Sequence, residues 1–117
     1  MSVVRVEKPW GHELIWAQAA TYVGKILHIR AGERLSLQYH VRKDETIMLD
    51  RGRMILEHFE ERAPPQQHEL RPLEPFHIPP GLRHRMIAVE DCDVIEVSTP
   101  HLDDVVRLED KYGRTGQ

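Results

Sequence analysis

Short stretches of alternating hydrophobic and polar residues run along most of the chain. Residues 35–40 place hydrophobic side chains on one face and Ser36, Gln38 and His40 on the other. Residues 24–30 alternate in the same way, with Lys25, Leu27 and Ile29 sharing a face. Since successive side chains of a strand point to opposite faces, both stretches predict half-buried β-strands.

Further strands are predicted at residues 46–49, 54–59, 76–79, 83–89 and 93–98, and a first strand within residues 5–16. Residues 50–53 (DRGR) have the composition of a hairpin turn between two of these strands. Residues 63–67 (APPQQ) are predicted to be an exposed loop without strand structure. Six to eight short strands in one domain favour an all-β barrel or jelly roll.

The C-terminal region has a different pattern. Residues 98–100 (STP) end the last strand, and Asp103 has the residue type of a helix N-cap. Val105, Val106 and Leu108 would form the apolar side of a short helix over residues 104–111, with Gly113 after it. We therefore expect a short C-terminal helix that closes one end of the barrel.

Length and charge narrow the functional classes. The 117 residues fit one domain over residues 1–117, and a net charge of −3 with acidic and basic residues interspersed argues against a nucleic-acid partner. No apolar run approaches the roughly 20 residues of a membrane helix, so no membrane partner is expected. A single cysteine, Cys92, and an N-terminus without signal-peptide features predict a cytoplasmic protein.

Four residues have the chemistry and spacing of a metal site. Gln38 and His40 lie two apart on the same face of a predicted strand, and Glu45 follows the polar turn 41–44. His84 follows a rigid turn formed by residues 79–81 (PPG). An amide oxygen, two imidazoles and a carboxylate can form the inner shell of a divalent metal ion.

The metal itself is less constrained than the ligands. Imidazole, amide and carboxylate ligands admit zinc, manganese, iron or nickel, and zinc is expected first because the chemistry considered below needs no redox step. The other histidines lie outside this spacing and are not assigned to a site, because a lone histidine on a strand is usually packed or exposed. They are His12, His28, His58, His68, His77 and His101.

The spacing of these residues resembles the two motifs of the cupin superfamily. The first motif runs from Gly32 through Gln38, His40 and Glu45 to Gly52, and the second covers residues 79–84 (PPGLRH). The resemblance implies a single-domain cupin, a jelly-roll β-barrel. Cupins usually carry histidine where this chain has Gln38, and the Gln-x-His variant resembles phosphomannose isomerases.

A closer resemblance is to the cupin (type II mannose-6-phosphate isomerase) domain of bifunctional mannose-6-phosphate isomerase/mannose-1-phosphate guanylyltransferases. It rests on residues 5–11 (RVEKPWG), 32–40 (GERLSLQYH) and 103–114 (DDVVRLEDKYGR), which span nearly the whole chain. Family members commonly have His-Trp after the ligand glutamate, where this chain has Thr46 and Ile47. Nothing in the chain resembles the nucleotidyltransferase half.

The resemblance implies a metal-dependent aldose–ketose isomerase acting on a sugar or sugar phosphate. Such a reaction needs a base that moves a proton between C1 and C2. Glu96 is the candidate, because strand alternation points it away from Ile95 and Val97 and into the barrel. The candidates for binding a substrate phosphate are Lys25, from strand alternation, and Arg107 and Arg114, from the family tail.

Two other functions remain open. One is a non-catalytic cupin that binds a sugar or sugar nucleotide and partners a separate nucleotidyltransferase. The other is an iron-dependent cupin dioxygenase, which an amide ligand in place of a third imidazole disfavours. A homodimer is expected, because small barrels cover exposed strand edges by pairing, and residues 5–16 could supply such an edge.

Overall fold

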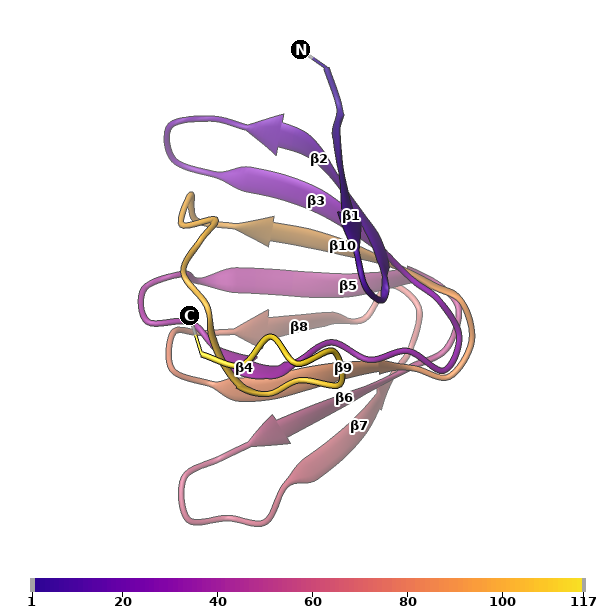
Figure 1. Ribbon diagram of the computed structural model, residues 1–117, viewed down its shortest axis with the longest axis vertical. Coiled ribbons are helices and arrows are strands. Elements are labelled where there is room, and N and C mark those ends of the chain that lie inside the picture. Colours follow the sequence, from indigo (N-terminus) through magenta and orange to yellow (C-terminus); the bar gives the residue numbers. More distant parts are fainter. Residues whose placement is uncertain (1, 117) are drawn as a thin grey trace.

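The computed structural model describes residues 2–116, which form eleven β-strands joined by turns (Figure 1). The strands are β1 (Val4–Lys8), β2 (Gly11–Gln18), β3 (Val23–Ile29), β4 (Leu37–Tyr39), β5 (Glu45–Arg51), β6 (Met54–Phe59), β7 (Gln66–Leu70), β8 (Pro75–Ile78), β9 (Arg83–Ala88), β10 (Cys92–Ser98) and β11 (Val106–Glu109). Within residues 2–116 there is no helix, and therefore none that could cross a membrane. The predicted all-β class is confirmed.

The strands form two antiparallel sheets. The first has six strands in the order β1-β2-β3-β10-β5-β8, and the second has five in the order β11-β4-β9-β6-β7. From β3 to β6 successive strands alternate between the sheets, so β4 and β5, which carry the first motif, lie in different sheets. Strands β6 and β7 form a hairpin within the five-stranded sheet, and the alternation resumes from β7 to β11. Figure 1 shows β2, β3, β10, β5 and β8 of the six-stranded sheet one below another with β1 crossing in front, and β4, β9, β6 and β7 of the second sheet lower in the view.

Strand alternation determines which side chains enter the space between the sheets. In β3, Lys25, Leu27 and Ile29 are buried while His28 is partly exposed, and in β10 Glu96 is buried between half-exposed Ile95 and exposed Val97. The buried apolar core comprises Trp10, Leu27, Ile29, Leu35, Ile47, Leu49, Met54, Leu56, Leu70, Ile78, Met86, Ala88, Cys92 and Val94. The same inward faces thus supply both the core and several charged groups.

Two glycines shape the turns that carry the motifs. Gly52 has φ +98° between β5 and β6, and a Cβ there would collide with the Asp91 carbonyl. Gly81 has φ +87°, and its N–H donates to the His40 carbonyl at 2.8 Å. Because a side chain is strained at such φ values, glycine is favoured at both positions. The Gly81 hydrogen bond ties the second motif directly to the first.

The predicted C-terminal helix is wrong. Residues 106–109 form β11, which pairs with β4 at the edge of the five-stranded sheet, and the yellow C-terminal segment runs alongside β4 in Figure 1. Asp103, the predicted N-cap, therefore precedes no helix, and the carboxylate of Asp104, the predicted first helical residue, accepts hydrogen bonds from the backbone N–H groups of residues 41–43. Tertiary pairing with β4 therefore overrides the local helical pattern.

Two other predicted boundaries also differ. Residues 5–16 form a hairpin, β1 and β2, rather than one strand, and Gln66 and Gln67 belong to β7 rather than to a loop. Strand β7 is a polar edge strand that pairs only with β6, so it lacks the hydrophobic alternation that reveals a strand in sequence. Together with β11, the split of residues 5–16 and the missed β7 raise the number of strands from the predicted six to eight to eleven.

Candidate metal centre

Three of the four predicted metal ligands meet between the sheets. His40 follows β4, Glu45 begins β5 and His84 lies in β9, and their ligand atoms all lie within 4.8 Å of one another. The Nε2 atoms of His40 and His84 are 3.5 Å and 3.7 Å from Glu45 Oε1. All three side chains are buried. Residues distant in sequence therefore form one compact group of potential ligands.

The backbone fixes the orientation of both imidazole rings. His40 Nδ1 lies 2.6 Å from the Asp104 carbonyl oxygen, and His84 Nδ1 lies 2.9 Å from that of Leu82. A carbonyl only accepts, so each Nδ1 donates its hydrogen, and a neutral ring then has a lone pair on Nε2. Both Nε2 atoms are buried without a hydrogen-bond partner and face the Glu45 carboxylate. Two lone pairs facing a carboxylate fit a divalent cation.

The ionisation states also suit a metal. Burial lowers the pKa of His84 and so favours its neutral, ligating form. Burial opposes ionisation of Glu45, but its contact with His40 and the charge of Lys43 outweigh this effect and hold its pKa at about 2. Both groups are therefore in the protonation state that metal binding requires at neutral pH.

Gln38, the fourth predicted ligand, lies beside this group. It pairs in register with His84, so the two side chains share a face of neighbouring strands, and it lines the adjoining cavity. Its amide oxygen accepts a hydrogen bond from the Ser36 hydroxyl at 2.5 Å. Since an amide oxygen has a second lone pair, Gln38 retains the capacity to act as an oxygen ligand.

A cavity of about 260 Å³ lies between the sheets, with His40 and Glu45 in its wall. Pockets for drug-sized ligands span about 300–1,000 Å³, so this cavity suits a molecule the size of a monosaccharide. Its lining includes every predicted substrate-site residue: Lys25, Glu96, Arg107 and Arg114. Trp10, Ile15, Leu27 and Met86 contribute apolar walls.

Lys43 is a site residue that sequence reasoning missed. Its buried ammonium lies 3.0 Å from Glu45 Oε2 and 3.1 Å from Glu96 Oε2, and it lines the cavity. Burial disfavours its charge, but Glu96 and Glu45 outweigh this and raise the pKa of Lys43 above its ordinary value. Lys43 stands two residues before Glu45, and this i, i+2 spacing could have indicated a shared face.

Glu96 is buried beside Lys43, as its strand alternation predicts. Burial raises the pKa of its carboxyl, and the negative charge of Glu45 adds to this effect, against the opposing charges of Lys43 and Lys25. A carboxylate with a raised pKa is a stronger base than an exposed one. Glu96 thus combines basicity with a place on the cavity wall.

Two lysines meet on one carboxylate in the cavity wall. Glu13 lies 3.0 Å from Lys25 Nζ and 3.7 Å from Lys8 Nζ, and all three residues line the cavity. Two cations on one carboxylate leave a net positive charge. Lys25 is therefore in the cavity as predicted, but it is paired with Glu13, which the sequence analysis did not identify.

Two arginines of the C-terminal segment complete this basic region. Arg114 is paired with Asp110 through Nε at 2.9 Å and Nη2 at 3.1 Å. Arg107 Nε is buried without a hydrogen-bond partner, and burial together with the charge of Arg114 lowers the Arg107 pKa. Arg107 therefore has an unused donor in the wall of a cavity whose lining contains five basic and five acidic residues.

The segment before β11 also positions the metal centre. The Asp104 carboxylate accepts hydrogen bonds from Val41, Arg42 and Lys43 N–H at 3.0, 2.6 and 2.8 Å, and its carbonyl accepts from His40. Burial raises the pKa of Asp104, but the three N–H donors together outweigh this effect and hold the pKa at about 2. The C-terminal segment thus fixes the loop between the two first-motif ligands.

The departure from the family pattern after Glu45 lies away from the cavity wall. Ile47 is fully buried in the apolar core, and Thr46 is on the opposite face of β5, paired in register with His77. Among the described residues that line the cavity, neither Thr46 nor Ile47 occurs. Neither residue of this departure therefore contributes to the cavity wall.

Comparison with solved structures identifies the fold. The capsular polysaccharide assembling protein CapF from Staphylococcus aureus superposes with a TM-score of 0.76 at 15% identity, over 92% of this chain and 34% of that chain. KdgF from Halomonas sp. gives 0.72 at 21% identity, over 88% and 89%. Oxalate decarboxylase from Lactobacillus farciminis gives 0.76 at 18% identity, over 91% and 33%.

At these identities the similarity establishes the fold alone, and it confirms the predicted cupin architecture. The chain spans about a third of the length of CapF and of oxalate decarboxylase. A comparison with curated proteins found no similar sequence. The family described as "Mannose-6-phosphate isomerase C-terminal" matches residues 2–110, nearly the whole chain, and the protein therefore belongs to that family.

Proposed function

We propose that the protein is a metal-dependent aldose–ketose isomerase that acts on a sugar phosphate of the mannose-6-phosphate type. The observation that carries this proposal is the position of Glu96. It is a buried carboxylate with a raised pKa, in the wall of a monosaccharide-sized cavity that also contains His40 and Glu45. The family to which the chain belongs supports the same reaction.

The residues that would hold the ion are His40, Glu45 and His84, with Gln38 as a further oxygen ligand. A bound divalent ion, with zinc as our first choice, would supply Lewis-acid polarisation of the sugar carbonyl. The rest of the chemistry belongs to the side chains around it.

Glu96 acts as the base in this proposal. It removes a proton from the carbon next to the carbonyl and returns it to the neighbouring carbon, through an enediol. Lys43, 3.1 Å from Glu96 Oε2, holds the carboxylate in position, and its fixed positive charge offsets negative charge that develops on the sugar oxygens. The apolar walls around Trp10 and Leu27 limit water near these groups.

A substrate phosphate would bind among the basic residues of the same cavity. Arg107 has an unpartnered Nε, and the Glu13 carboxylate there carries two lysines, Lys8 and Lys25. Guanidinium groups bind phosphate oxygens well because they present several donors in one plane. We assign Arg107 as the main phosphate ligand, with Arg114 and Lys25 supporting it.

The test is proton NMR of the metal-loaded protein with mannose 6-phosphate and fructose 6-phosphate in heavy water. We expect interconversion and deuterium incorporation at C1 or C2. Glu96→Gln should slow both by about 10²–10⁴-fold and keep its metal, because only the base is lost. Glu61→Gln, an exposed residue, is the matched control. No exchange across hexose phosphates and free pentoses with metal bound would refute the isomerase.

A non-catalytic sugar-binding role is the second candidate. The contact between Lys43 and Glu96 favours this non-catalytic role. The Lys43 ammonium stabilises the ionised form of the Glu96 carboxylate, and this makes Glu96 a weaker base toward a substrate proton. Calorimetry that shows saturable binding of a sugar phosphate or sugar nucleotide, without deuterium exchange, would favour this role. Absence of any sugar binding would exclude it.

The cytoplasmic location and the homodimer stay predictions. Strand β1 is an edge strand of the six-stranded sheet, which is the position expected for a strand that pairs with a second copy. Sedimentation analysis of the full chain would decide the oligomeric state, and a monomer at micromolar concentration would refute the dimer.

A further inference from the structure

A second histidine pair lies on the outer face of the six-stranded sheet, away from the cavity. Cross-strand neighbours form one continuous row across β1, β2, β3, β10 and β5. In order the row is Glu7, His12, His28, Asp93 and Arg51, each paired in register with the next. Side chains paired in this way on adjacent strands lie about 4.5–5.5 Å apart at Cβ. The two imidazoles are therefore direct neighbours, with a carboxylate on either side.

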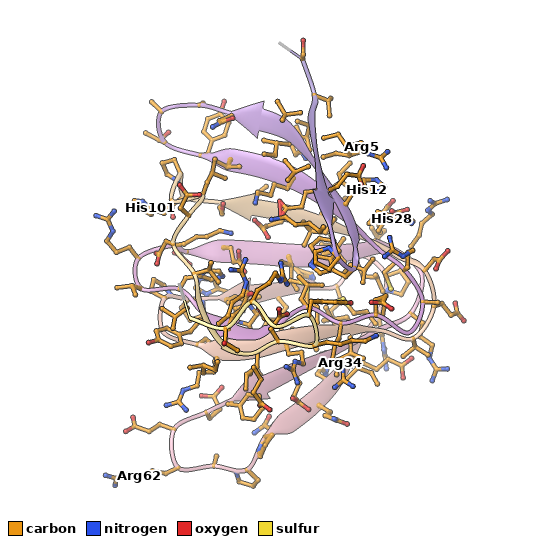
Figure 2. The ribbon with its side chains drawn as sticks, in the orientation of Figure 1. Arg5, His12, His28, Arg34, Arg62 and His101 are labelled. Carbon is orange, nitrogen blue, oxygen red and sulfur yellow. The ribbon has the colours of Figure 1, made fainter. Side chains whose placement is uncertain are left out.

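The rings of His12 and His28 are stacked, with centroids 5.0 Å apart and 23° between the planes. Figure 2 shows both residues on the same side of the molecule near Arg5, well away from His101. The side chain of His28 is 30% exposed, so an ion from solvent can reach it.

The tautomer of His28 is fixed as in the inner site. Its Nδ1 lies 2.7 Å from Asp93 Oδ1, and a carboxylate only accepts, so Nδ1 carries the hydrogen and Nε2 of the neutral ring has the lone pair. Arg51 in turn holds the other oxygen of Asp93 through Nε at 2.8 Å and Nη2 at 2.5 Å. A carboxylate that orients a histidine through Nδ1 is a common arrangement behind histidine metal ligands.

The charges around the pair are balanced. The two arginines that face it are each neutralised, Arg5 by Glu7 at 2.6 Å and Arg51 by Asp93. Burial and the positive charge of Arg5 lower the pKa of His12, against the opposing charges of Glu7 and Asp93. This favours the neutral, ligating form of His12, and the arginines facing the pair are each matched by a carboxylate.

We propose that His12 and His28 form a second, surface metal site, with Asp93 orienting His28, that takes a late first-row divalent ion such as Cu²⁺, Ni²⁺ or Zn²⁺. Imidazole nitrogen is the preferred ligand of these ions, whereas Mg²⁺ and Ca²⁺ require oxygen ligands. Among the three, Cu²⁺ binds most tightly by the general affinity order of divalent metals. The ion links β2 to β3, and this site does not depend on the proposed function.

The test uses Cu²⁺ and the full-length His84→Asn variant, in which the inner site has lost a ligand. Calorimetry is expected to show one copper ion bound per chain, and pulsed EPR is expected to show coupling to imidazole nitrogens. Adding His12→Asn or His28→Asn should weaken this binding at least 10-fold. His77→Asn is the matched control, since His77 also contacts a carboxylate, Asp44 at 2.6 Å, but has no imidazole partner in its row.

Copper binding that is unchanged by His12→Asn and His28→Asn would overturn the proposal, as would equal weakening by His77→Asn. If the variants that combine His84→Asn with His12→Asn or His28→Asn do not fold, wild-type protein and the single variant His12→Asn provide the test. Wild-type protein should then bind two copper ions per chain, and His12→Asn only one. Two ions in both proteins would also overturn the proposal.

Discussion

The inner and outer histidine pairs share one feature, a hydrogen bond that fixes a histidine Nδ1, and differ in the residues that surround them. An acceptor holds Nδ1 and leaves Nε2 available in both inner rings and, in the outer pair, in His28. The inner rings, His40 and His84, are tilted by 47° with centroids 5.5 Å apart, whereas the outer rings, His12 and His28, are stacked. The inner acceptors are backbone carbonyls, while the outer acceptor is the Asp93 side chain.

The two pairs also differ in how their carboxylates are compensated. Glu45 is buried and faces the buried ammonium of Lys43, whereas Asp93 is paired with Arg51, whose side chain is 75% exposed. Charge interactions are stronger where water is excluded, and unpaired charges cost more there. Charge interactions around the inner pair should therefore contribute strongly to stability, whereas those around the outer pair should contribute little. Four predictions test this difference.

The largest effect is expected from removing the counter-charges. Lys43→Met leaves Glu45 and Glu96 buried without their cation, and the metal-free protein should lose about 3–5 kcal/mol of unfolding free energy. Adding a divalent ion should recover part of this loss. Arg51→Met, the outer equivalent, should leave stability unchanged within error, because the side chain is exposed. Urea unfolding gives the unfolding free energy of both variants. Equal values for Lys43→Met and Arg51→Met would contradict the expected difference between the inner and outer pairs.

Next in size is the loss of an inner ligand. Glu45→Ala should reduce inner-site metal affinity at least about 100-fold, more than the loss of a supporting residue behind a ligand. The fold should persist, because the apolar core does not depend on Glu45 and Lys43 keeps Glu96 as a partner. Zinc calorimetry and thermal unfolding test this. A metal-free variant that melts far below metal-stripped wild type would show that Glu45 is structural.

Acid stability should separate the inner carboxylate from the outer one. The folded pKa of Glu45, about 2, lies below its ordinary value of 4.5. Its contribution to stability is thus complete above pH 4.5 and is lost as the pH falls toward 2. In metal-free protein the stability lost in this way is on the order of 2 kcal/mol. Glu45→Gln should therefore flatten the dependence of the unfolding free energy on pH. Asp93→Asn should flatten it much less, since the Arg51 guanidinium that pairs with Asp93 is exposed to solvent. The midpoints of urea unfolding, measured for the three proteins from pH 7 to pH 3, test this prediction.

The smallest effect concerns the group behind the outer pair. Asp93→Asn should weaken copper binding at His12 and His28 by about 10–100-fold, since it removes the carboxylate that orients His28. Metal at the inner site should be unaffected. No side-chain substitution can do the same inside, where backbone carbonyls hold the rings. Unchanged copper affinity in Asp93→Asn would show that Asp93 does not orient His28.

Prediction from sequence succeeded where a local pattern has a direct spatial consequence. The i, i+2 relation of Gln38 and His40, the turn before Glu45 and the glycine-containing turn before His84 follow from strand and turn geometry. The inward direction of Glu96 follows from strand alternation in the same way. Prediction from sequence failed for the C-terminal segment and for β7. Both are edge strands, and they form because they pair with a neighbouring strand rather than because of their own residue pattern.

The sequence by itself determined the all-β class, the inward faces of the strands and the residue types of the metal ligands, because these depend on alternation and short spacing. Only the tertiary structure decided that Lys43 joins Glu45 to Glu96 and that Asp104 fixes the loop between His40 and Glu45. It also decided that His12 and His28 are neighbours. Each of these contacts depends on strand register or on a distant segment, which no local pattern encodes.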